Sequence, residues 1–318
     1  MRTQYEEIRI RGRRRMVPAA LIGNCTAIVT GGVIKLAQIK HEELVEGEVL
    51  ANPQEFISSL KQSGLDADVF TFAERPPQTT PRYDYHVEWD NWAAIPITTF
   101  REWWENRLPQ ESRKNVRRAE KRGVVVRSVA FTDELVSGIK CIYDETPVRQ
   151  GRRFWHFGKG FEAVKAENGT YCERSEFIGA FFHDELIGFV KIIYVDHIAT
   201  IVQILSMNQH HDKRPMNALL AHTVQICSTR KTSFLVYGKY TYGKNKETSL
   251  GEFKRRNGFE ELRFPRYYIP LKATGKLAIA CGLHLGISNV VPSWALWLLR
   301  NCRSRFYEFW SRPVVRKT

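Results

Sequence analysis

The chain has 318 residues, 43% of them hydrophobic and 12% aromatic, and its formal net charge is +14. This composition supports a large core and excludes an intrinsically disordered protein. The excess of positive charge is typical of a protein that binds a phosphate-bearing ligand, a nucleic acid or an anionic membrane face, and equally of a solvated basic surface. Six scattered cysteines show no CxxC or Cys/His ligand spacing, which predicts reduced thiols in a cytoplasmic protein.

The first hundred residues predict a basic arm followed by a small mixed α/β unit. Residues 1–17 are rich in arginine and are expected to form a mobile arm. Asn52 can cap a helix over residues 53–62, Pro53 fits its first turn, and Gly64 ends it. Runs of β-branched and aromatic residues predict strands at 27–29, 33–39, 69–72, 85–89 and 93–97.

Helical patterns become frequent after residue 98. Apolar residues three or four apart predict helices at 99–107, 111–122, 133–143 and 159–167, with a strand at 124–129. The helix at 111–122 carries Arg and Lys almost all round. It is therefore either a solvated helix or an anion-binding face.

The stretch from Glu176 to Arg230 organises the rest of the chain. Three apolar runs joined by short polar turns predict an antiparallel meander, at 177–182, 186–194 and 198–205. From Pro215 the apolar residues fall three or four apart, which indicates an amphipathic helix. The elements expected to follow are a strand at 234–237, a helix at 250–256 and a last strand pair at 259–264 and 266–271.

Three stretches, taken together, resemble a GNAT acyltransferase domain, and more particularly its Fem-type branch. They are Ser112–Ala119 with Gly123-Val124, the segment Glu176–Arg230, and the closing segments Glu252–Phe259 and Pro265–Leu271. The resemblance covers about half of the chain. It implies an α/β (α+β) fold with a mixed, mostly antiparallel sheet flanked by helices. The parts expected are a small α/β half at 18–98, for which the resemblance offers a degenerate GNAT half as one reading, the acyltransferase domain at 99–272 and, from its composition, a basic aromatic helical tail at 273–318.

The resemblance implies acyl transfer from a thioester such as acyl-CoA, with no permanently bound cofactor. In this fold the pantetheine arm enters a gap between two central strands, and the pyrophosphate binds the amides that open the next helix. The donor-binding residues expected here are Ile204, Leu205, Ser206, His211, Lys213, Arg214, Met216 and Asn217. The spaced glycines of the family's phosphate loop are absent. Either Lys213 and Arg214 replace them by charge, or CoA binding is lost, which keeps an aminoacyl-tRNA donor open.

Acyl transfer also needs a base for the incoming nucleophile and an acid for the departing thiolate. The family often places a tyrosine acid after the last central strand, where this chain has Tyr237, Tyr240 and Tyr242. Packing against Phe253 is their alternative role. His210 and His211 lack a third ligand at suitable spacing, so no metal site is predicted.

A basic, aromatic loop lies between residues 146 and 157. Glu145 and His156 flank it and are further candidates for proton transfer. The arginines expected to bind an anionic acceptor are Arg149, Arg152 and Arg153. A surface loop anchored by Phe154 and Trp155 explains the same pattern.

The C-terminal tail is basic and aromatic. Residues 272–318 carry eight Lys or Arg and one acid, Glu308. Glycines and Pro292 interrupt its uncharged stretch, which argues against a straight spanning helix. The segment Leu277–Trp310 is predicted either to bind an anionic membrane face or to dock on its own domain or a partner subunit.

These patterns predict a cytoplasmic acyltransferase that works at the inner membrane face. It is expected to move an acyl or aminoacyl group from a donor such as acyl-CoA to an amine or hydroxyl of a lipid- or glycan-linked acceptor. One alternative is an aminoacyl-tRNA-dependent Fem-type transferase. Another is a catalytically silent GNAT-fold protein that binds a membrane or RNA; measured binding of acyl-CoA would argue against that role.

Overall fold

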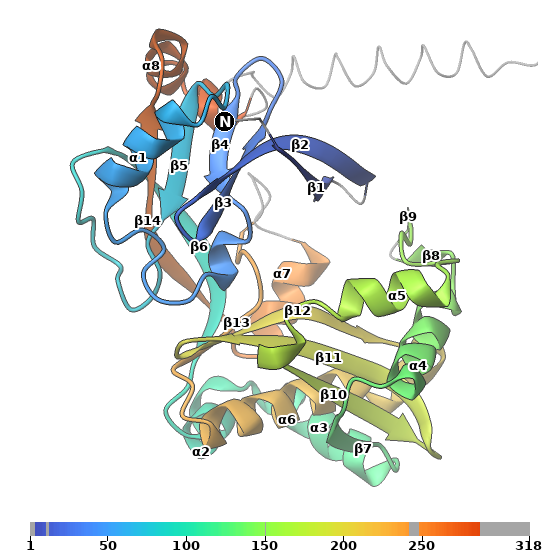
Figure 1. Ribbon diagram of the computed structural model, residues 1–318. Helices are drawn as coiled ribbons and strands as arrows, with labels where there is room; N and C mark the ends of the chain where they lie inside the picture. Colours follow the sequence, from blue (N-terminus) through green and yellow to red (C-terminus); the bar gives the residue numbers. More distant parts are fainter. Residues whose placement is uncertain (1–3, 11–12, 150, 242–247, 287–318) are drawn as a thin grey trace, which may run out of the picture.

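The chain folds around one twelve-stranded sheet in the computed structural model (Figure 1). The structure describes residues 4–10, 13–149, 151–241 and 248–286. From one edge to the other the strands are β1 (Gln4–Ile10), β2 (Arg13–Ile22), β3 (Cys25–Thr30), β4 (Leu36–Ile39), β5 (Val69–Ala73), β14 (Glu260–Pro270), β6 (His86–Pro96), β13 (Phe234–Val236), β12 (Ile198–Ser206), β11 (Glu185–Val195), β10 (Ser175–Phe182) and β7 (Val125–Val129).

Helices flank this sheet. They are α1 (Pro53–Gln62), α2 (Phe100–Glu102) with a π turn at Trp103–Arg107, α3 (Gln110–Lys121), α4 (Asp133–Asp144), α5 (Phe161–Asn168), α6 (Pro215–Thr229), α7 (Ser249–Arg256) and α8 (Ala273–Ala280). Short 3-10 turns lie at η1 (Glu42–Leu44), η3 (Cys172–Arg174), η4 (Asn208–Lys213) and η5 (Leu283–Leu285), and β8 (Val148–Arg149) pairs with β9 (Arg152–Arg153) in a small hairpin. The predicted mixed, mostly antiparallel sheet flanked by helices is confirmed.

The two halves of the sheet repeat one order of elements. In each half an antiparallel meander leads through a helix to a parallel strand. In the first half β4 pairs with β5 after α1, and in the second half β12 pairs with β13 after α6. This repeat agrees with the tandem arrangement that the family resemblance implies.

The halves exchange one strand each. β6, which follows the first half in sequence, lies beside β13 of the second half, with Leu235 opposite Ile95. β14, which follows the second half, lies beside β5 of the first half, with Ile269 opposite Phe70. Because β6 and β14 also pair with each other, the exchange joins the two halves into one sheet.

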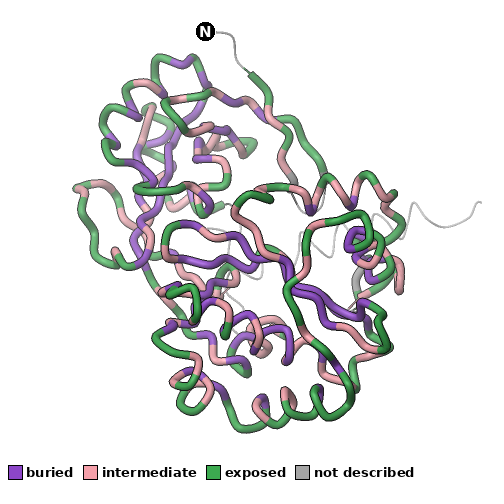
Figure 2. Tube along the Cα trace, turned by 60° about the horizontal axis from the view of Figure 1, so that its bottom comes forward, coloured by how far each residue is buried: buried purple, intermediate pink, exposed green. Residues whose placement is uncertain are grey.

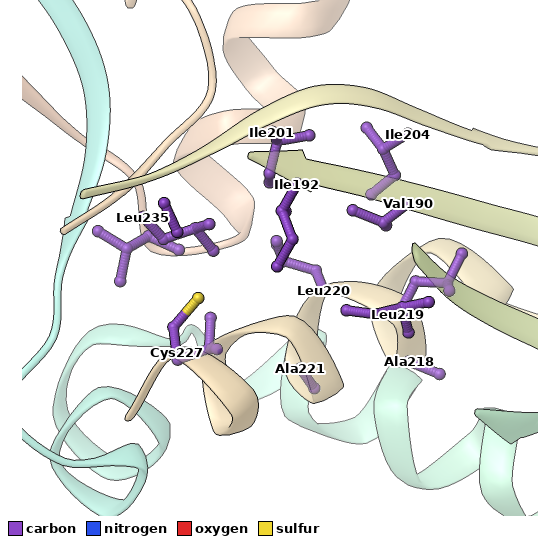
Figure 3. Packing of buried hydrophobic residues seen from close by; sticks show 14 of the residues in the cluster. Val190, Ile192, Ile201, Ile204, Ala218, Leu219, Leu220, Ala221, Cys227 and Leu235 are labelled. Atoms are coloured by element: carbon purple, nitrogen blue, oxygen red, sulfur yellow. The ribbon is translucent and has the colours of Figure 1, made fainter. Parts of the chain in front are cut away.

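The core of the second half lies between α6 and the meander (Figure 3). Leu219 and Leu220 of α6 are almost fully buried against Val190 of β11 and Ile204 of β12. Each leucine contributes about 1.5–3 kcal/mol by leaving water. α4 covers the opposite face of β10 and β11, where Ile139 packs in a separate cluster. Buried residues run through the strands of both halves, while the outer loops are exposed (Figure 2).

Two expectations from the sequence were wrong. Residues 4–10 and 13–22 are not a mobile arm but an antiparallel hairpin, with Tyr5 opposite Pro18, and Val17 and Ala19 pack against Ile28. The strands expected at 85–89 and 93–97 are one strand, β6, and those expected at 259–264 and 266–271 are also one, β14.

Pro265 does not interrupt β14 because it faces the position just beyond the end of the neighbouring strand β5. Its carbonyl oxygen accepts a hydrogen bond from the Glu74 amide, one residue beyond the end of β5. The amide hydrogen that proline lacks would point to the same side, so no ladder hydrogen bond within β5 is lost.

Within the part of the chain that the structure describes, no helix is long and apolar enough to cross a membrane. The tail predicted at Leu277–Trp310 is described only as far as Gly286, so the rest of that prediction lies outside the described residues.

Candidate functional site

β12 and β13 form a fork. They pair in parallel over three residues, from Ile198 opposite Phe234 to Thr200 opposite Val236, and β12 then continues to Ser206. The register between β11 and β12 shifts at this point: Lys191 lies opposite Gln203 and Ile192 opposite Ile201. Val202 is therefore an extra residue in β12, and such a bulge bends a strand and redirects its side chains. The two strands separate where the family resemblance places the donor.

The fork opens into a cleft between the two halves. The cleft has a volume of ≈ 1550 Å³, and an adjoining cavity of ≈ 520 Å³ shares several of its walls. β4 and η1 line one side, and β12, α5 and the start of the segment after β13 line the other. Residues that line it include Gln38, Glu42, Gln203, Leu205 and Tyr237. A space of this size can hold a substrate much larger than a single amino acid.

A hydrogen-bonded chain of side chains leads from α4 and α5 into the cleft. Asn168 Nδ2 donates to the hydroxyl of Tyr143 at 3.3 Å, and that hydroxyl donates to Gln203 Oε1 at 2.9 Å. Gln203 therefore turns its amide nitrogen toward His156 Nε2, 3.3 Å away. The His156 ring is buried and lies against the Trp155 ring at a tilt of 37°, with ring centres 3.5 Å apart. The network holds Gln203 and His156 in one orientation at the cleft wall.

Lys191 is buried next to this network. Its Nζ donates to the carbonyl oxygen of Asn168 at 2.7 Å and to Oγ1 of Thr170 at 3.1 Å. Burial lowers the pKa of Lys191 to about 8. The same lysine therefore ties α5 to β11 and lines the smaller cavity.

Lys254 of α7 is a second buried lysine, and it lies at the fork. Its side chain is fully buried, and its Nζ donates to the carbonyl oxygen of Lys239 at 2.7 Å. The same Nζ lies 4.8 Å from the centre of the Tyr237 ring. Burial lowers the pKa of Lys254 to about 8. A proton-exchanging group thus sits behind the tyrosine that faces the cleft.

An ionic network closes the opposite side of the cleft. Arg266 of β14 binds Asp90 at 2.9 Å and Glu42 at 2.8 Å, and Lys239 binds the other oxygen of Asp90 at 2.9 Å. Burial raises the pKa of Glu42, although Arg266 opposes the shift. Burial would also raise the pKa of Asp90, but Arg266 and Lys239 outweigh it and lower that pKa. The network joins η1, β6 and β14 where the exchanged strands meet.

The start of α6, where donor phosphates were expected, presents few backbone donors. Pro215 has no amide hydrogen, and the amides of Asn217 and Ala218 donate to the carbonyl oxygen of Arg214 at 3.1 and 3.4 Å. Arg214 takes a left-handed conformation, with φ 57°. Its Nε is buried and has no hydrogen-bond partner among the described residues. Among these first residues, the Met216 amide is therefore the one that can donate to a ligand at the helix start.

The charges around this helix start are mixed. Lys213 Nζ lies 4.7 Å from the centre of the Phe182 ring and 3.5 Å from a carboxylate oxygen of Asp212. The same carboxylate binds Arg122 at 3.1 Å. His211 is exposed. A carboxylate beside the helix start disfavours a pyrophosphate there, since like charges repel.

The flanks of the basic loop are tied down by their own contacts. Glu145 binds Arg149 at 3.0 Å and accepts a hydrogen bond from the Gln209 amide at 2.8 Å. Arg149 also donates to the carbonyl oxygen of Ser206 at 2.9 Å. These contacts hold the loop against the end of β12. Arg153 is exposed on the loop.

The remaining predicted donor and acid residues are spread over the second half. Ile204 is buried beneath the fork, Leu205 lines the cleft, and Asn217 Nδ2 donates to Asn257 at 3.1 Å. Tyr240 packs at the edge of the α6 core. Tyr242 and the side chain of Arg152 lie outside the described residues.

Sequence reasoning missed the buried polar groups of the cleft. Lys191, Asn168 and Gln203 are far apart in the sequence, and nothing local marks them. Lys254 had one available signal, because it stands on the buried side of a short amphipathic helix between Phe253 and two arginines. A lysine in the apolar position of a helix is uncommon and deserves a functional hypothesis.

A comparison with protein-family models finds no match to this sequence, and a comparison with curated proteins finds none either. Among solved structures, the chain is similar to a C-terminal domain assigned to a lysylphosphatidylglycerol synthetase of Agrobacterium fabrum, with TM-score 0.52, 14% identity, and 83% of this chain and 87% of that chain covered. It is also similar to L-PGS from Bacillus licheniformis, with TM-score 0.51, 15% identity and coverage of 82% and 85%. FemX gives a TM-score of 0.49 at 12% identity, with coverage of 88% and 90%. The first two likenesses show a shared fold.

Proposed function

We propose that this chain is an acyl- or aminoacyltransferase. It would move a carboxylic acyl group from an activated carrier to an amine or hydroxyl of a lipid- or glycan-linked acceptor. The observation that carries the proposal is the fork between β12 and β13, which opens into a cleft lined by both halves. A carrier entering the fork from one side and an acceptor reaching it from the cleft would meet in a defined orientation, which lowers the entropic part of the barrier.

The fold supports the class of acceptor. The chain shares its fold with a domain assigned to a lysylphosphatidylglycerol synthetase, a name that describes a lysyl group carried on a lipid. The cleft is large enough for a headgroup together with an acyl carrier end. The proposed acceptor therefore combines a phosphate or glycan headgroup with a reactive amine or hydroxyl.

The proposed reaction is a single displacement at the acyl carbon. The lone pair of the amine or hydroxyl attacks the carbonyl carbon, the bond to the carrier breaks, and the proton of the nucleophile ends on the departing oxygen or sulfur. Tyr237 is proposed to deliver a proton to the leaving group. Lys254, behind its ring, would stabilise negative charge on the phenolic oxygen. Gln203 and His156 would orient the acceptor at the cleft wall.

The start of α6 favours an aminoacyl ester over acyl-CoA as the donor. Its single outward amide, at Met216, and the carboxylate of Asp212 suit a pyrophosphate poorly. Arg214 Nε, which has no hydrogen-bond partner among the described residues, and the ammonium of Lys213 suit a phosphodiester, which carries one charge per phosphate. An aminoacyl-tRNA provides such a backbone together with an activated aminoacyl ester.

The test uses the purified full-length chain and two donors. A mixture of radiolabelled aminoacyl-tRNAs and a set of acyl-CoAs that includes acetyl-CoA and palmitoyl-CoA are each incubated with a total lipid extract. We expect label to enter the lipid fraction from aminoacyl-tRNA, and Tyr237→Phe to lower that rate at least tenfold with donor affinity unchanged. Tyr85→Phe, in the core of the first half, is the matched control.

The alternatives have their own outcomes. The donor is a thioester if only acyl-CoA labels the lipid and the double variant Lys213→Glu, Arg214→Glu binds acyl-CoA more weakly. Binding of neither donor in calorimetry, and transfer from neither, would reject a transferase and leave a catalytically silent binding protein. An unchanged rate for Tyr237→Phe would remove only the role proposed for that tyrosine.

A further inference from the structure

Three potential metal ligands meet at the far end of the exchanged strands. His86 and Glu88 lie two residues apart on β6, so their side chains leave the same face of the sheet. His284 comes from η5, almost two hundred residues later in the sequence, after α8 has packed on Val69 and Tyr268. One ligand atom from each of the three lies within 4.8 Å of the others.

The distances suit a small cation. His86 Nε2 lies 3.2 Å from Glu88 Oε1, and His284 Nε2 lies 3.7 Å from the same oxygen. A tetrahedral site with bonds of about 2.0–2.1 Å separates its ligand atoms by about 3.4 Å. The arrangement therefore needs only a small rotation of the exposed His86 ring to reach that geometry.

His284 is the group that points to a ligand. Its side chain is 1% exposed, and its Nε2 has no hydrogen-bond partner among the described residues. Its Nδ1 faces the carbonyl oxygen of Ala278 at 3.4 Å. A carbonyl only accepts, so in the tautomer with its proton on Nδ1 the ring donates to Ala278, and Nε2 then presents a lone pair toward His86 and Glu88. Metal-binding histidines are commonly held in this way, with the second ring nitrogen bonded to a backbone carbonyl.

The surroundings hold the site in place. The His284 ring lies 4.5 Å from the Tyr268 ring and 5.3 Å from the His86 ring, measured between centres. Tyr268 is paired with His86 across β14 and β6. Two ligands thus come from a paired strand and the third is fixed by an aromatic wall, so the three side chains are arranged before any ion arrives.

We propose that His86, Glu88 and His284 bind one zinc ion, with water as the fourth ligand. Two imidazoles and one carboxylate form a donor set that zinc accepts readily. The ion would fasten η5, and through it α8, to β6. It would also brace the strand that carries Asp90, because Glu88 and Asp90 leave the same face of β6 and Asp90 belongs to the ionic network of the cleft.

The test measures zinc binding directly, on full-length protein without a histidine tag. The chain is stripped with a chelator and titrated with zinc against a competing metal indicator, and its thermal unfolding is followed with and without zinc. We expect one equivalent to bind and Tm to rise by several degrees, since a ligand that binds only the folded state stabilises it. Co²⁺ in place of zinc should give the strong visible absorption of tetrahedral coordination.

Three variants and one control make the assignment. His284→Ala and His86→Ala should each weaken zinc binding by at least about 100-fold, beyond the effect of losing an outer partner. Glu88→Gln keeps the size of the side chain and should weaken binding while leaving the circular dichroism spectrum unchanged. The control is His210→Ala, because His210 pairs with Glu185 at 3.5 Å and no third ligand accompanies that pair among the described residues.

Each outcome decides the proposal. One equivalent lost in the three variants and kept in the control supports it. The proposal is overturned if His284→Ala and Glu88→Gln bind zinc as tightly as the parent protein. It is also overturned if the parent protein does not compete with the indicator for zinc. If His284→Ala fails to fold, the variants His86→Ala, at an exposed position, and Glu88→Gln, at a half-buried one, still decide the question.

Discussion

The ammonium group of Lys254 lies 4.8 Å from the centre of the Tyr237 ring, at the point where β12 and β13 separate. The lysine is fully buried, whereas the tyrosine lines the cleft. This pairing places a titratable group of α7 behind a phenol that can reach a substrate. Its pKa and its charge are therefore open to measurement even before a substrate is known.

The first prediction concerns stability at alkaline pH. The pKa of Lys254 is about 8 in the folded chain and 10.5 without the burial, so between these values the unfolded chain binds more protons. The free energy of unfolding should therefore rise with pH across this window. The part of it that comes from Lys254 should be lost as the pH falls toward 8. Lys254→Met should lower the slope of unfolding free energy against pH by up to about 1.4 kcal/mol per unit. Urea unfolding at several pH values measures it.

Lys191 provides a matched comparison, because burial lowers its pKa to about 8 as well. Lys191→Met should remove a similar slope, and the double variant should remove both. Lys231→Met, at an exposed position, is the control that should leave the slope unchanged. A slope that does not differ between the parent protein and Lys254→Met contradicts the assignment.

The second prediction concerns the hydrogen-bonded chain at the cleft wall. Tyr143→Phe removes the hydroxyl that donates to Gln203 Oε1 and accepts from Asn168. Loss of a buried partner costs about 1–3 kcal/mol. The midpoint of urea unfolding should fall while the m-value stays constant. Tyr5→Phe, on an exposed side chain, should change stability by less than about 0.5 kcal/mol. Equal stability of the two variants would show that the hydrogen bonds of the Tyr143 hydroxyl contribute nothing to the free energy of unfolding.

The third prediction concerns the ionic network between the halves. Arg266→Met leaves the buried carboxylate of Glu42 without its ion pair and removes one of the two ion pairs that Asp90 makes with Arg266 and Lys239. The expected cost is about 3–5 kcal/mol, as for other broken buried pairs. Arg263→Met, in the same strand but paired with Glu261 near the surface, should cost no more than about 1 kcal/mol.

A second substitution checks the cause of that loss. Adding Glu42→Gln to Arg266→Met removes the uncompensated charge and should restore part of the stability. If the double variant is less stable than Arg266→Met alone, the loss comes from packing of the arginine side chain and not from the uncompensated charge of the buried Glu42.

The fourth prediction concerns the tail. A chain that ends at Gly286 keeps α8, whose Ala278 packs with Val69 and Tyr268, and removes six Arg or Lys of the basic tail, three of them within the predicted membrane-binding segment. Each basic side chain near an anionic surface contributes about 1 kcal/mol. Full-length protein should therefore sediment with vesicles that contain phosphatidylglycerol and much less with neutral ones, and added salt should weaken the binding.

The truncated chain decides between the two roles left open for the tail. If it stays in the supernatant and remains folded, the tail is the membrane anchor. Equal sedimentation of both chains would place the anchor elsewhere. Aggregation of the truncated chain without lipid would show that the tail packs on the protein or on a partner subunit.

Local patterns in the sequence determined most of the individual elements. The helix expected at 53–62 is α1, because Asn52 caps it through the Glu55 amide and its apolar residues share one face. The meander and the following helix were recognised for the same reason, since alternating and three-to-four-residue apolar spacings reflect the geometry of each element. The antiparallel order of the meander also followed, because its connecting turns are short.

Only the tertiary structure decided how these elements combine. The exchange of β6 and β14 brings Arg266 to Asp90 and Glu42, and it places His284 beside His86, although nothing in either neighbourhood of the sequence signals the contact. Lys191 and Gln203 likewise meet Thr170 and His156 only in the folded chain, and Lys254 meets the carbonyl oxygen of Lys239, in the segment after β13. Apolar periodicity records which side of an element is buried, whereas the partner on that side is selected by packing of the whole sheet. The candidate site is assembled by such long-range contacts, so Tyr237 and His156 could be proposed from the sequence, whereas the side chains that surround them became visible only in the folded chain.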